Sequence, residues 1–246
     1  MLIIFASVLM LLFIFAKKRY IGFIAWISTG FAFLQKVPEF LAIYDYFNTV
    51  VFTLAFVFFV ILGYTTLKGD LDVMLQVTRF SLLAILFYFP FELYEPLKRA
   101  LIKVVADHTF LLGKMLGFNF ERFSWDEIVL NERGIRIILP CTGIESMALY
   151  SGACFGVRAN FNRKIKAFLI SVPTIYILNL FRNVFVLASY GYMWFGENSF
   201  YIAHHVISKF LALISLIIIT LFVFKKLPEL ENLIINLKKE IEKVIR

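Results

Sequence analysis

Seven apolar segments, separated by short charged stretches, constrain this chain more than any other feature. They cover residues 2–16, 20–34, 40–64, 73–91, 142–157, 167–195 and 203–224. Helices of these lengths can cross a bilayer core of about 30 Å, although the shorter ones reach only about 22–25 Å and must stand upright or thin the bilayer. Hydrophobic residues make up 61% of the 246 residues, well above the roughly 45–50% of soluble domains. The sequence therefore predicts an all-α polytopic membrane protein with about seven transmembrane helices.

The net charge of +8 is concentrated beside the apolar segments. Basic clusters occupy residues 17–19, 158–166, 225–226 and 238–246. This placement is typical of membrane-flanking charge, and no separate basic domain is present that could carry a nucleic-acid site. Threading the chain with residues 17–19 inside also puts 158–166 and 225–226 inside, and it puts 92–140 outside. The segment 92–140 itself holds seven basic and seven acidic residues, and only the basic ones count against this orientation.

Four regions follow from these patterns. Residues 1–91 form N-terminal transmembrane helices, 92–140 an extracytoplasmic segment, 141–224 a transmembrane core with the candidate catalytic residues, and 225–246 an amphipathic C-terminal helix. Within the extracytoplasmic segment, residues 97–118 have helical spacing and predict an amphipathic helix on the membrane surface. Residues 128–130 and 135–138 predict a β-hairpin around a four-residue loop at 131–134. The helical spacing of residues 230–245 favours an interfacial helix over a coiled-coil partner site.

Three polar residues stand at the ends of apolar segments, and they define the candidate site: Cys141, Arg182 and His204. An ionisable group in such a place costs about 2.5–3.5 kcal/mol on insertion scales, so a functional role is the default interpretation. A thiol, a guanidinium and an imidazole together supply a nucleophile, a charge stabiliser and a proton carrier for acyl transfer.

Helical rise predicts that the three residues lie at the same side of the membrane. Thr142 and Glu145 match a capping box, which places Cys141 at the outer mouth of the following helix. Arg182 lies 15 residues above the start of its segment, about 22 Å up. His204 begins the last segment on the same side. The three residues remain on a common side of the membrane even if the whole topology is inverted.

Other polar residues near this level have simpler interpretations. Cys154 lies 13 residues beyond Cys141 on the same helix, about 20 Å away, so the pair cannot share a metal or a disulfide, and Cys154 is predicted to be packing. Adjacent histidines such as His204 and His205 point about 100° apart, and no metal-ligand spacing occurs, so neither a metal nor a cofactor is predicted. Glu145 is either a capping residue or a side chain that orients Arg182 or His204.

With these residues in this order, the second half of the chain resembles the archaeosortase/exosortase family of integral-membrane transpeptidases. The matching stretches are Cys141-Thr142-Gly143-Ile144, Asn179-Leu180-Phe181-Arg182-Asn183 and Ala203-His204-His205-Val206-Ile207. The family commonly has Gly four positions after its histidine, where this chain has Ser208. That spacing favours His204 as the functional histidine, with His205 as the alternative.

The resemblance implies a sortase-like cysteine transpeptidase or thiol protease of the cell membrane with an extracytoplasmic active site. Its partners would be secreted proteins that carry a C-terminal motif, a hydrophobic helix and a basic end. Cys141 would attack the scissile carbonyl, His204 would transfer protons and Arg182 would stabilise the oxyanion or hold the substrate. Asn179 and Asn183, as part of the matched motif, are candidate supporting residues. The acceptor would be a membrane lipid amine.

Three other functions are consistent with the same residues. A transporter or channel could use Arg182 and His204 to line a polar pathway, and Cys141 would then be dispensable. A non-catalytic membrane scaffold or assembly factor would tolerate substitution of all three residues. An intramembrane protease would require Cys141 but would let water, and not an amine, resolve the thioester.

Overall fold

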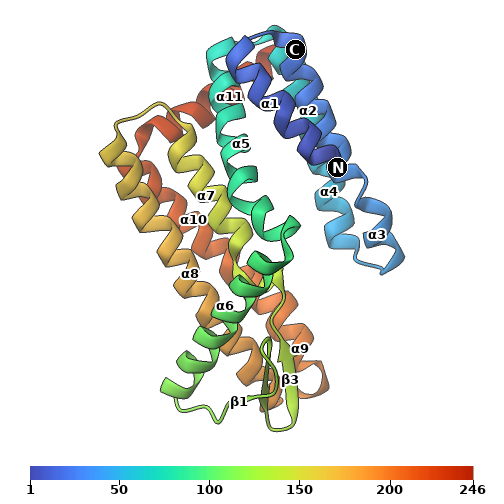
Figure 1. Ribbon diagram of the computed structural model, residues 1–246, viewed down its shortest axis with the longest axis vertical. Coiled ribbons are helices and arrows are strands. Elements are labelled where there is room, and N and C mark those ends of the chain that lie inside the picture. The colour runs from blue at the N-terminus through green and yellow to red at the C-terminus, as the bar shows by residue number, and fades with distance from the viewer. Residues whose placement is uncertain (246) are drawn as a thin grey trace. The chain divides into compact units, whose positions relative to one another are not determined.

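The computed structural model describes residues 1–245 and is built almost entirely of helices (Figure 1). In chain order the elements are α1 (Leu2–Ala16), α2 (Arg19–Leu34), α3 (Val37–Ala42), α4 (Tyr46–Lys68), α5 (Leu71–Leu93), α6 (Glu95–Met115), β1 (Glu121–Arg122), β2 (Glu127–Leu130), β3 (Arg133–Arg136), η1 (Leu139–Thr142), α7 (Ile144–Gly156), α8 (Phe161–Gly191), η2 (Gly196–Asn198), α9 (Ser199–Tyr201), η3 (Ile202–Ile207), α10 (Ser208–Lys226) and α11 (Pro228–Ile245). The predicted all-α membrane fold with a small sheet is confirmed.

Within residues 1–245, five helical stretches are long and apolar enough to cross a membrane. They are Arg19–Ala42, Tyr46–Lys68, Leu71–Leu93, Phe161–Gly191 and Gly196–Lys226. The apolar helix α1 has 15 residues and α7 has 13, about 22 Å and 20 Å of helix, which is shorter than a bilayer core of about 30 Å. The predicted number of seven spans therefore stays a prediction.

The chain forms two compact units. The first comprises Met1–Ile85, Phe155–Ala159 and the residues from Glu229 onward. In it, α1 packs on α2 and α2 packs on α4, around the fully buried side chains of Met10, Phe13 and Trp26. These three residues lie on α1 and α2 at positions that face the neighbouring helix, so the apolar sequence of the first spans is used for helix–helix packing as well as for lipid contact.

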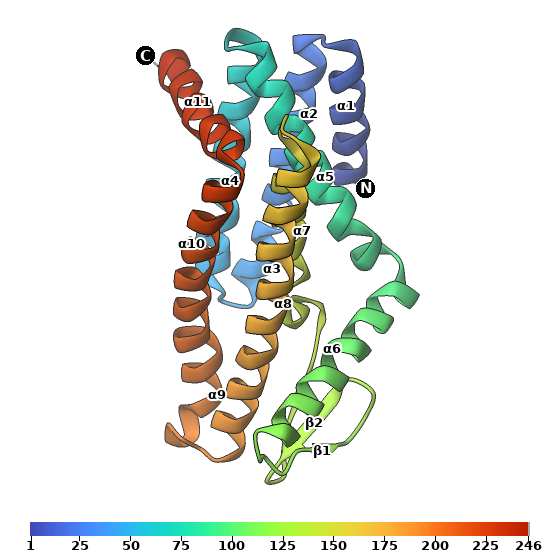
Figure 2. The same ribbon diagram turned by 90° about the vertical axis from the view of Figure 1, so that its left-hand side faces the viewer.

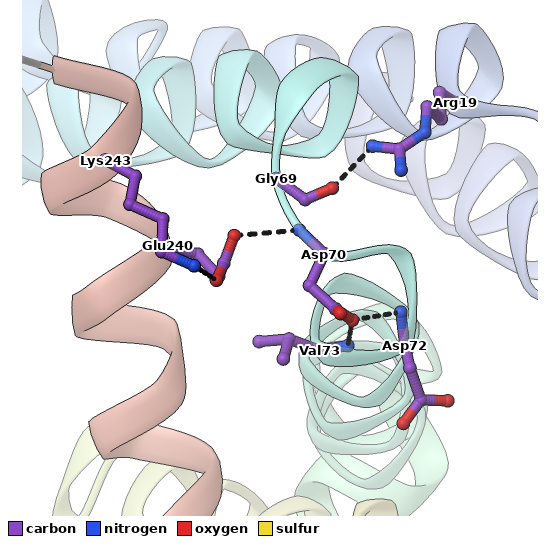
Figure 3. Close-up of polar contacts among 7 residues, drawn as sticks. All are labelled: Arg19, Gly69, Asp70, Asp72, Val73, Glu240 and Lys243. Atoms are coloured by element: carbon purple, nitrogen blue, oxygen red, sulfur yellow. Dashed lines mark hydrogen bonds and ion pairs between the residues drawn. The ribbon is translucent and has the colours of Figure 1, made fainter.

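Several hydrogen bonds of this first unit meet at the turn between α4 and α5 (Figure 3). Arg19 donates hydrogen bonds to the carbonyl oxygens at the end of α4, among them Gly69 at 2.6 Å. The Asp70 carboxylate accepts from the backbone N–H groups of Asp72 and Val73 at the start of α5. The backbone N–H of Asp70 donates to Glu240 on α11 at 2.9 Å. Both exposed helix ends at this turn are thereby capped.

The second unit comprises Leu86–Cys154 and Asn160–Pro228. Helix α8 is its central element, because α6, α10, β2 and β3 all pack on it. Figure 2 shows α8 and α10 running side by side, with α9 at the end where they join. Helix α6 packs one face on α8 and on the sheet, and its buried positions are Ile102, Val105, Ala106, Thr109 and Gly113. Gly113 is required there, since a Cβ would lie 2.0 Å from the Phe120 ring.

A three-stranded antiparallel sheet, in the order β1-β2-β3, covers one end of α8. The buried strand residues Ile128 and Leu130 form a core cluster with Phe120 and with Val184 and Leu187 of α8. The predicted hairpin is present, but the predicted four-residue loop at 131–134 is wrong. Leu130 pairs with Arg133 and Val129 pairs with Gly134, so the loop is only Asn131-Glu132. Both loop residues have positive φ, 52° and 65°, as a two-residue type I′ turn requires. The strand β1 was not predicted from the sequence.

Candidate active site

Cys141 lies in the 3₁₀ turn η1, between the end of the hairpin and the start of α7. Its backbone N–H donates to the carbonyl of Ile138 at 2.8 Å. Thr142 Oγ1 donates to Leu139 O at 2.7 Å and accepts from the Ile144 N–H at 3.3 Å. Thr142 therefore accepts from the first N–H of α7, but the N-cap is Gly143, whose carbonyl accepts the first helical hydrogen bond from Met147 at 3.1 Å, one residue later than the sequence predicts. The reciprocal half of the capping box is wrong, because within residues 1–245 no hydrogen bond joins the Glu145 side chain to the cap, which leaves that carboxylate available for other charges.

Gly143 turns the chain from η1 into α7. It has φ 76° and ψ 7°, in the left-handed region that costs a residue with a Cβ roughly 1–2 kcal/mol. A Cβ at this position would also lie 3.1–3.3 Å from side-chain atoms of Asn179. Both the backbone conformation and the close approach of α8 therefore require glycine beside Cys141.

Two asparagines of α8 hold the backbone of Cys141. Asn179 Nδ2 donates to the Cys141 carbonyl oxygen at 2.7 Å, and Asn183 Nδ2 donates to the same oxygen at 3.0 Å. The two residues are one helical turn apart and therefore share a face of α8. They are only 8% and 7% exposed. Such buried amides are stabilising only when they are paired, and the Cys141 carbonyl with its two lone pairs satisfies both.

Arg182, which lies between the two asparagines in sequence, contacts His204. Its Nη2 lies 3.1 Å from His204 Nε2. A guanidinium can only donate, so Nε2 accepts this hydrogen bond and the neutral ring carries its proton on Nδ1. Nδ1 is buried and has no hydrogen-bond partner in the part of the chain that the structure describes. The imidazole therefore accepts a hydrogen bond at Nε2, and its Nδ1–H donates to no group within residues 1–245.

The two histidine rings are in contact, with centroids 4.5 Å apart, but they have different neighbours. Both lie in η3, a turn of π-helix that precedes α10, and π-turns are frequent at functional sites. His204 stacks on Phe200, with ring centroids 5.2 Å apart and an interplanar angle of 11°. His205 is exposed and stacks on Tyr201 at 5.4 Å. His204 is therefore the histidine that the fold presents to Arg182.

Glu145 lies close enough to Arg182 to interact with it electrostatically. Its carboxylate interacts favourably with the Arg182 guanidinium and unfavourably with Glu92. Glu92 in turn accepts a hydrogen bond of 3.4 Å from the hydroxyl of Tyr88. Of the two roles considered for Glu145, reciprocal capping has no hydrogen bond to support it within residues 1–245, and orientation of Arg182 stays a prediction.

The structure joins the residues singled out from the sequence into two hydrogen-bonded groups that are both anchored on α8, and the His205 ring contacts His204. Cys141, Asn179 and Asn183 are linked by hydrogen bonds, Arg182 and His204 by another, and Glu145 by electrostatic interaction. Three neighbours were missed: Phe200, Tyr88 and Glu92. The stacking of Phe200 on His204 follows from their i, i+4 spacing and could have been found. Tyr88 and Glu92 lie at the end of the predicted span 73–91 and directly after it, and the sequence pattern does not show that this helix end approaches Glu145.

A cavity of about 440 Å³ adjoins these residues. It lies between α8 and α10, and Gly143, Asn179 and Arg182 form part of its wall. The rest of the wall is mainly apolar and includes Ile175, Leu178, Leu216 and Ile219. Within residues 1–245, no group of three or more His, Cys, Asp or Glu side chains is arranged to hold a metal ion.

The comparisons with known proteins define the class. The family model described as "Transmembrane exosortase" matches residues 1–223, and the chain belongs to this family. Among curated proteins, it is similar to archaeosortase A of Haloferax volcanii, with 28% identity over 85% of this chain and 81% of that protein. It is also similar to archaeosortase A of Natronomonas pharaonis, with 27% identity over 65% of this chain and 60% of that protein. No solved structure matches. The chain is therefore a multi-pass membrane protein of a family of membrane processing enzymes.

Proposed function

We propose that this protein is a cysteine transpeptidase that cleaves the C-terminal sorting signal of secreted proteins and transfers the new C-terminus to a membrane lipid amine. The single observation that carries the proposal is the joint anchoring of the candidate residues on α8. Asn179 and Asn183 bind the backbone of Cys141, and Arg182, on the same turns, binds His204. A nucleophile, a charge stabiliser and a proton carrier are thereby fixed relative to one rigid element, which acyl transfer needs.

In the first half-reaction, the Cys141 thiol gives its proton to His204 and its sulfur bonds to the scissile carbonyl carbon. The peptide C–N bond breaks, and His204 returns the proton to the leaving amine. In the second half-reaction, an acceptor amine attacks the thioester and passes a proton to His204. The C–S bond breaks, an amide forms, and the proton restores the Cys141 thiol. The same steps with water in place of the amine give hydrolysis.

Arg182 is proposed to serve both the oxyanion and the histidine. In the resting structure its guanidinium donates to His204 Nε2, which occupies the lone pair that must receive the thiol proton. When a tetrahedral intermediate forms, the same donor can turn to the oxyanion, and Nε2 becomes free. Loss of one oxyanion donor typically lowers kcat by about 10²–10³. Lysine cannot replace the planar fork of the guanidinium.

The substrate and orientation belong to the same proposal. The signal would consist of a short motif, a hydrophobic helix and a basic end. The helix would approach from the bilayer, and the site would face the extracytoplasmic side. The basic clusters that flank the apolar segments on the opposite side support this orientation.

The test uses the full-length protein in vesicles with a secreted protein that carries such a C-terminal signal. Cys141→Ala and Cys141→Ser should abolish cleavage, and Arg182→Lys and His204→Ala should lower it by about 10²-fold or more. Cys154→Ala and His205→Ala are the matched controls and should retain it. A mass increase on Cys141, removed by hydroxylamine, should identify the thioester.

Three results would change the proposal. If Cys141→Ala keeps full function while Arg182 and His204 variants lose it, a transporter or channel is the better assignment. If all three substitutions are tolerated, the protein is a non-catalytic scaffold or assembly factor. If the substrate is released with a free carboxyl terminus although lipid amines are present, the enzyme is a protease and not a transpeptidase.

A further inference from the structure

The cavity between α8 and α10 continues from the candidate active site into the apolar part of the second unit. At one end it is bounded by Asn179 and Arg182, and further along by Ile175, Leu216 and Ile219. On α10 its wall extends from Ser208 to Ile219, 11 residues or about 16 Å of helix. The cavity therefore has a polar part, where Arg182 lies and where Asn179 binds the Cys141 backbone, and an apolar part further along α8 and α10.

Ser208 supplies an independent indication that the cavity receives a ligand with a polar part. The residue is only 2% exposed, and its hydroxyl has no hydrogen-bond partner within residues 1–245, yet it lines the cavity. A buried hydroxyl without a partner costs about 1–3 kcal/mol, so a buried unpaired hydroxyl at a cavity wall indicates an absent partner. Ser208 is one helical turn after His204, at the end of the cavity that adjoins the site.

The dimensions argue against a fully enclosed helix as the occupant. A helix about 16 Å long and 10–12 Å in diameter fills about 1,250–1,800 Å³, several times the cavity volume of about 440 Å³. The hydrophobic helix of a sorting signal can lie against the mouth of the cavity but cannot be fully enclosed by it. An enclosed occupant must be a thin, extended chain.

The chemistry of the wall decides between an extended peptide and a hydrocarbon chain. An extended peptide would bring one N–H and one C=O per residue, and each unsatisfied group costs several kcal/mol in an apolar environment. The apolar part of this cavity is lined by Ile175, Leu216 and Ile219, and the hydroxyls of Ser146 and Ser215 on its wall are too few to pair with a row of peptide groups. A hydrocarbon chain needs no such partners.

We propose that this cavity binds one hydrocarbon chain of a phospholipid, with the lipid's phosphate at the Arg182 end. The guanidinium complements the charge of a phosphate, and its fixed fork matches phosphate oxygens. The Ser208 hydroxyl gains its missing partner from the polar oxygens at the top of the chain. A headgroup amine held in this way lies next to the proposed Cys141 thioester. The proposal rests on the proposed function, since it identifies the binding site of the lipid acceptor.

The first test fills the cavity without touching the candidate catalytic residues. Ala212, on the cavity wall, is changed to Phe, and the control is Leu213→Phe, which adds an aromatic ring at a lipid-facing position 58% exposed. Cleavage of the tailed substrate and its mass increase by the lipid are measured separately in phosphatidylethanolamine vesicles. We expect Ala212→Phe to lower transfer by about tenfold or more, because the acceptor is displaced, and to keep cleavage within about twofold of the control.

Equal losses of cleavage and transfer in Ala212→Phe would overturn the lipid site and assign the cavity to the peptide substrate. Unchanged transfer would overturn it as well. If the unmodified protein cleaves nothing, the proposed function fails, and the lipid site is then judged by binding alone.

Binding is measured with a phosphatidylethanolamine that carries a photoreactive diazirine near the end of one chain. The site predicts that cross-links concentrate on the peptides containing residues 175–185 and 208–219. They should be lost in Ala212→Phe and retained in Leu213→Phe. Cross-links distributed evenly over the outward faces of the helices, or equal in both variants, would contradict a lipid site in the cavity.

Discussion

The position of Cys141 depends on side chains that touch only its backbone. Asn179 and Asn183 both donate to its carbonyl oxygen, and Gly143 is shaped to fit against Asn179. The thiol itself is left unconstrained by hydrogen bonds within residues 1–245. Substitutions at these neighbours should therefore act on the geometry of the nucleophile and leave its chemistry intact.

Gly143→Ala tests this dependence. The alanine is forced into a left-handed conformation, which costs roughly 1–2 kcal/mol, and its Cβ also presses on Asn179. Gly117→Ala is the matched control, because Gly117 has φ 88° and open space around its Cβ position. Both variants should lower the thermal stability in detergent by similar amounts. Only Gly143→Ala should also lower the rate of substrate cleavage, and an equal loss of activity in both variants would contradict the role of the Asn179 contact.

The residues of the site were largely predictable, whereas their contacts were not. Helical rise along each segment is enough to place Cys141, Arg182 and His204 at one level. Rotation about the helix axis decides which side chains meet, and the π-turn η3 changes that rotation just where the two histidines lie. Helical spacing therefore did not decide which of His204 and His205 contacts Arg182. In the structure His204 does so. The catalytic roles stay a proposal.

At the scale of elements, the loop of the hairpin before Cys141 was predicted with the wrong length. Gly134 suggested a loop that ends at glycine, but Gly134 lies within β3, opposite Val129. The register is set by the pairing of Ile128 with Ile135, since Ile128 belongs to the core cluster and Ile135 packs against it. Packing of this apolar pair outweighs the cost of a left-handed conformation at Glu132.

Helix α11 is attached to the α4–α5 turn through Glu240. Hydrogen bonds from the Lys243 side chain and from the Asp70 backbone N–H lower the pKa of the Glu240 carboxyl below its usual value of about 4.3. Because the folded-state pKa is depressed, this contact contributes stability above the usual pKa and loses it as the pH falls through the lowered value. The attachment should therefore be complete at neutral pH and weaken only in strong acid.

Hydrogen exchange of the amides in residues 228–245 measures this attachment. At a pH below about 4, the protection of these amides relative to their intrinsic exchange rate should decrease. Glu240→Gln should decrease the protection already at pH 7. Glu242→Gln is the control, since Glu242 has only a 3.8 Å ion pair with Lys238 on the exposed side. Equal protection in both variants at pH 7 would remove Glu240 from the attachment.

For the whole molecule, the membrane fold was predictable because hydropathy alone demands it. The number of crossings was not, since α1 and α7 are shorter than a bilayer core is thick. Whether a short helix crosses depends on tilt, local thinning and neighbouring helices. Strand β1 escaped prediction for a related reason: two residues, Glu121 and Arg122, carry no periodic pattern, and only their pairing with β2 makes them a strand.

Orientation is the prediction that belongs to this scale. In a Cys154→Ala variant the remaining cysteine is Cys141. A membrane-impermeant maleimide should label it in intact cells, because the site is proposed to face outward. Labelling in inverted vesicles but not in intact cells would reverse the orientation without affecting the grouping of Cys141, Arg182 and His204.

The contact between Asp70 and Glu240 also bears on the order of events during synthesis. The two residues are 170 positions apart, and at about 5–20 residues per second the ribosome needs roughly 10–30 s to cover that distance. For most of this interval the first unit lacks α11, although α1 to α5 have already been synthesised. Completion of the N-terminal half therefore waits for a helix translated long after it, and a stall late in translation would leave that half open to quality-control proteases.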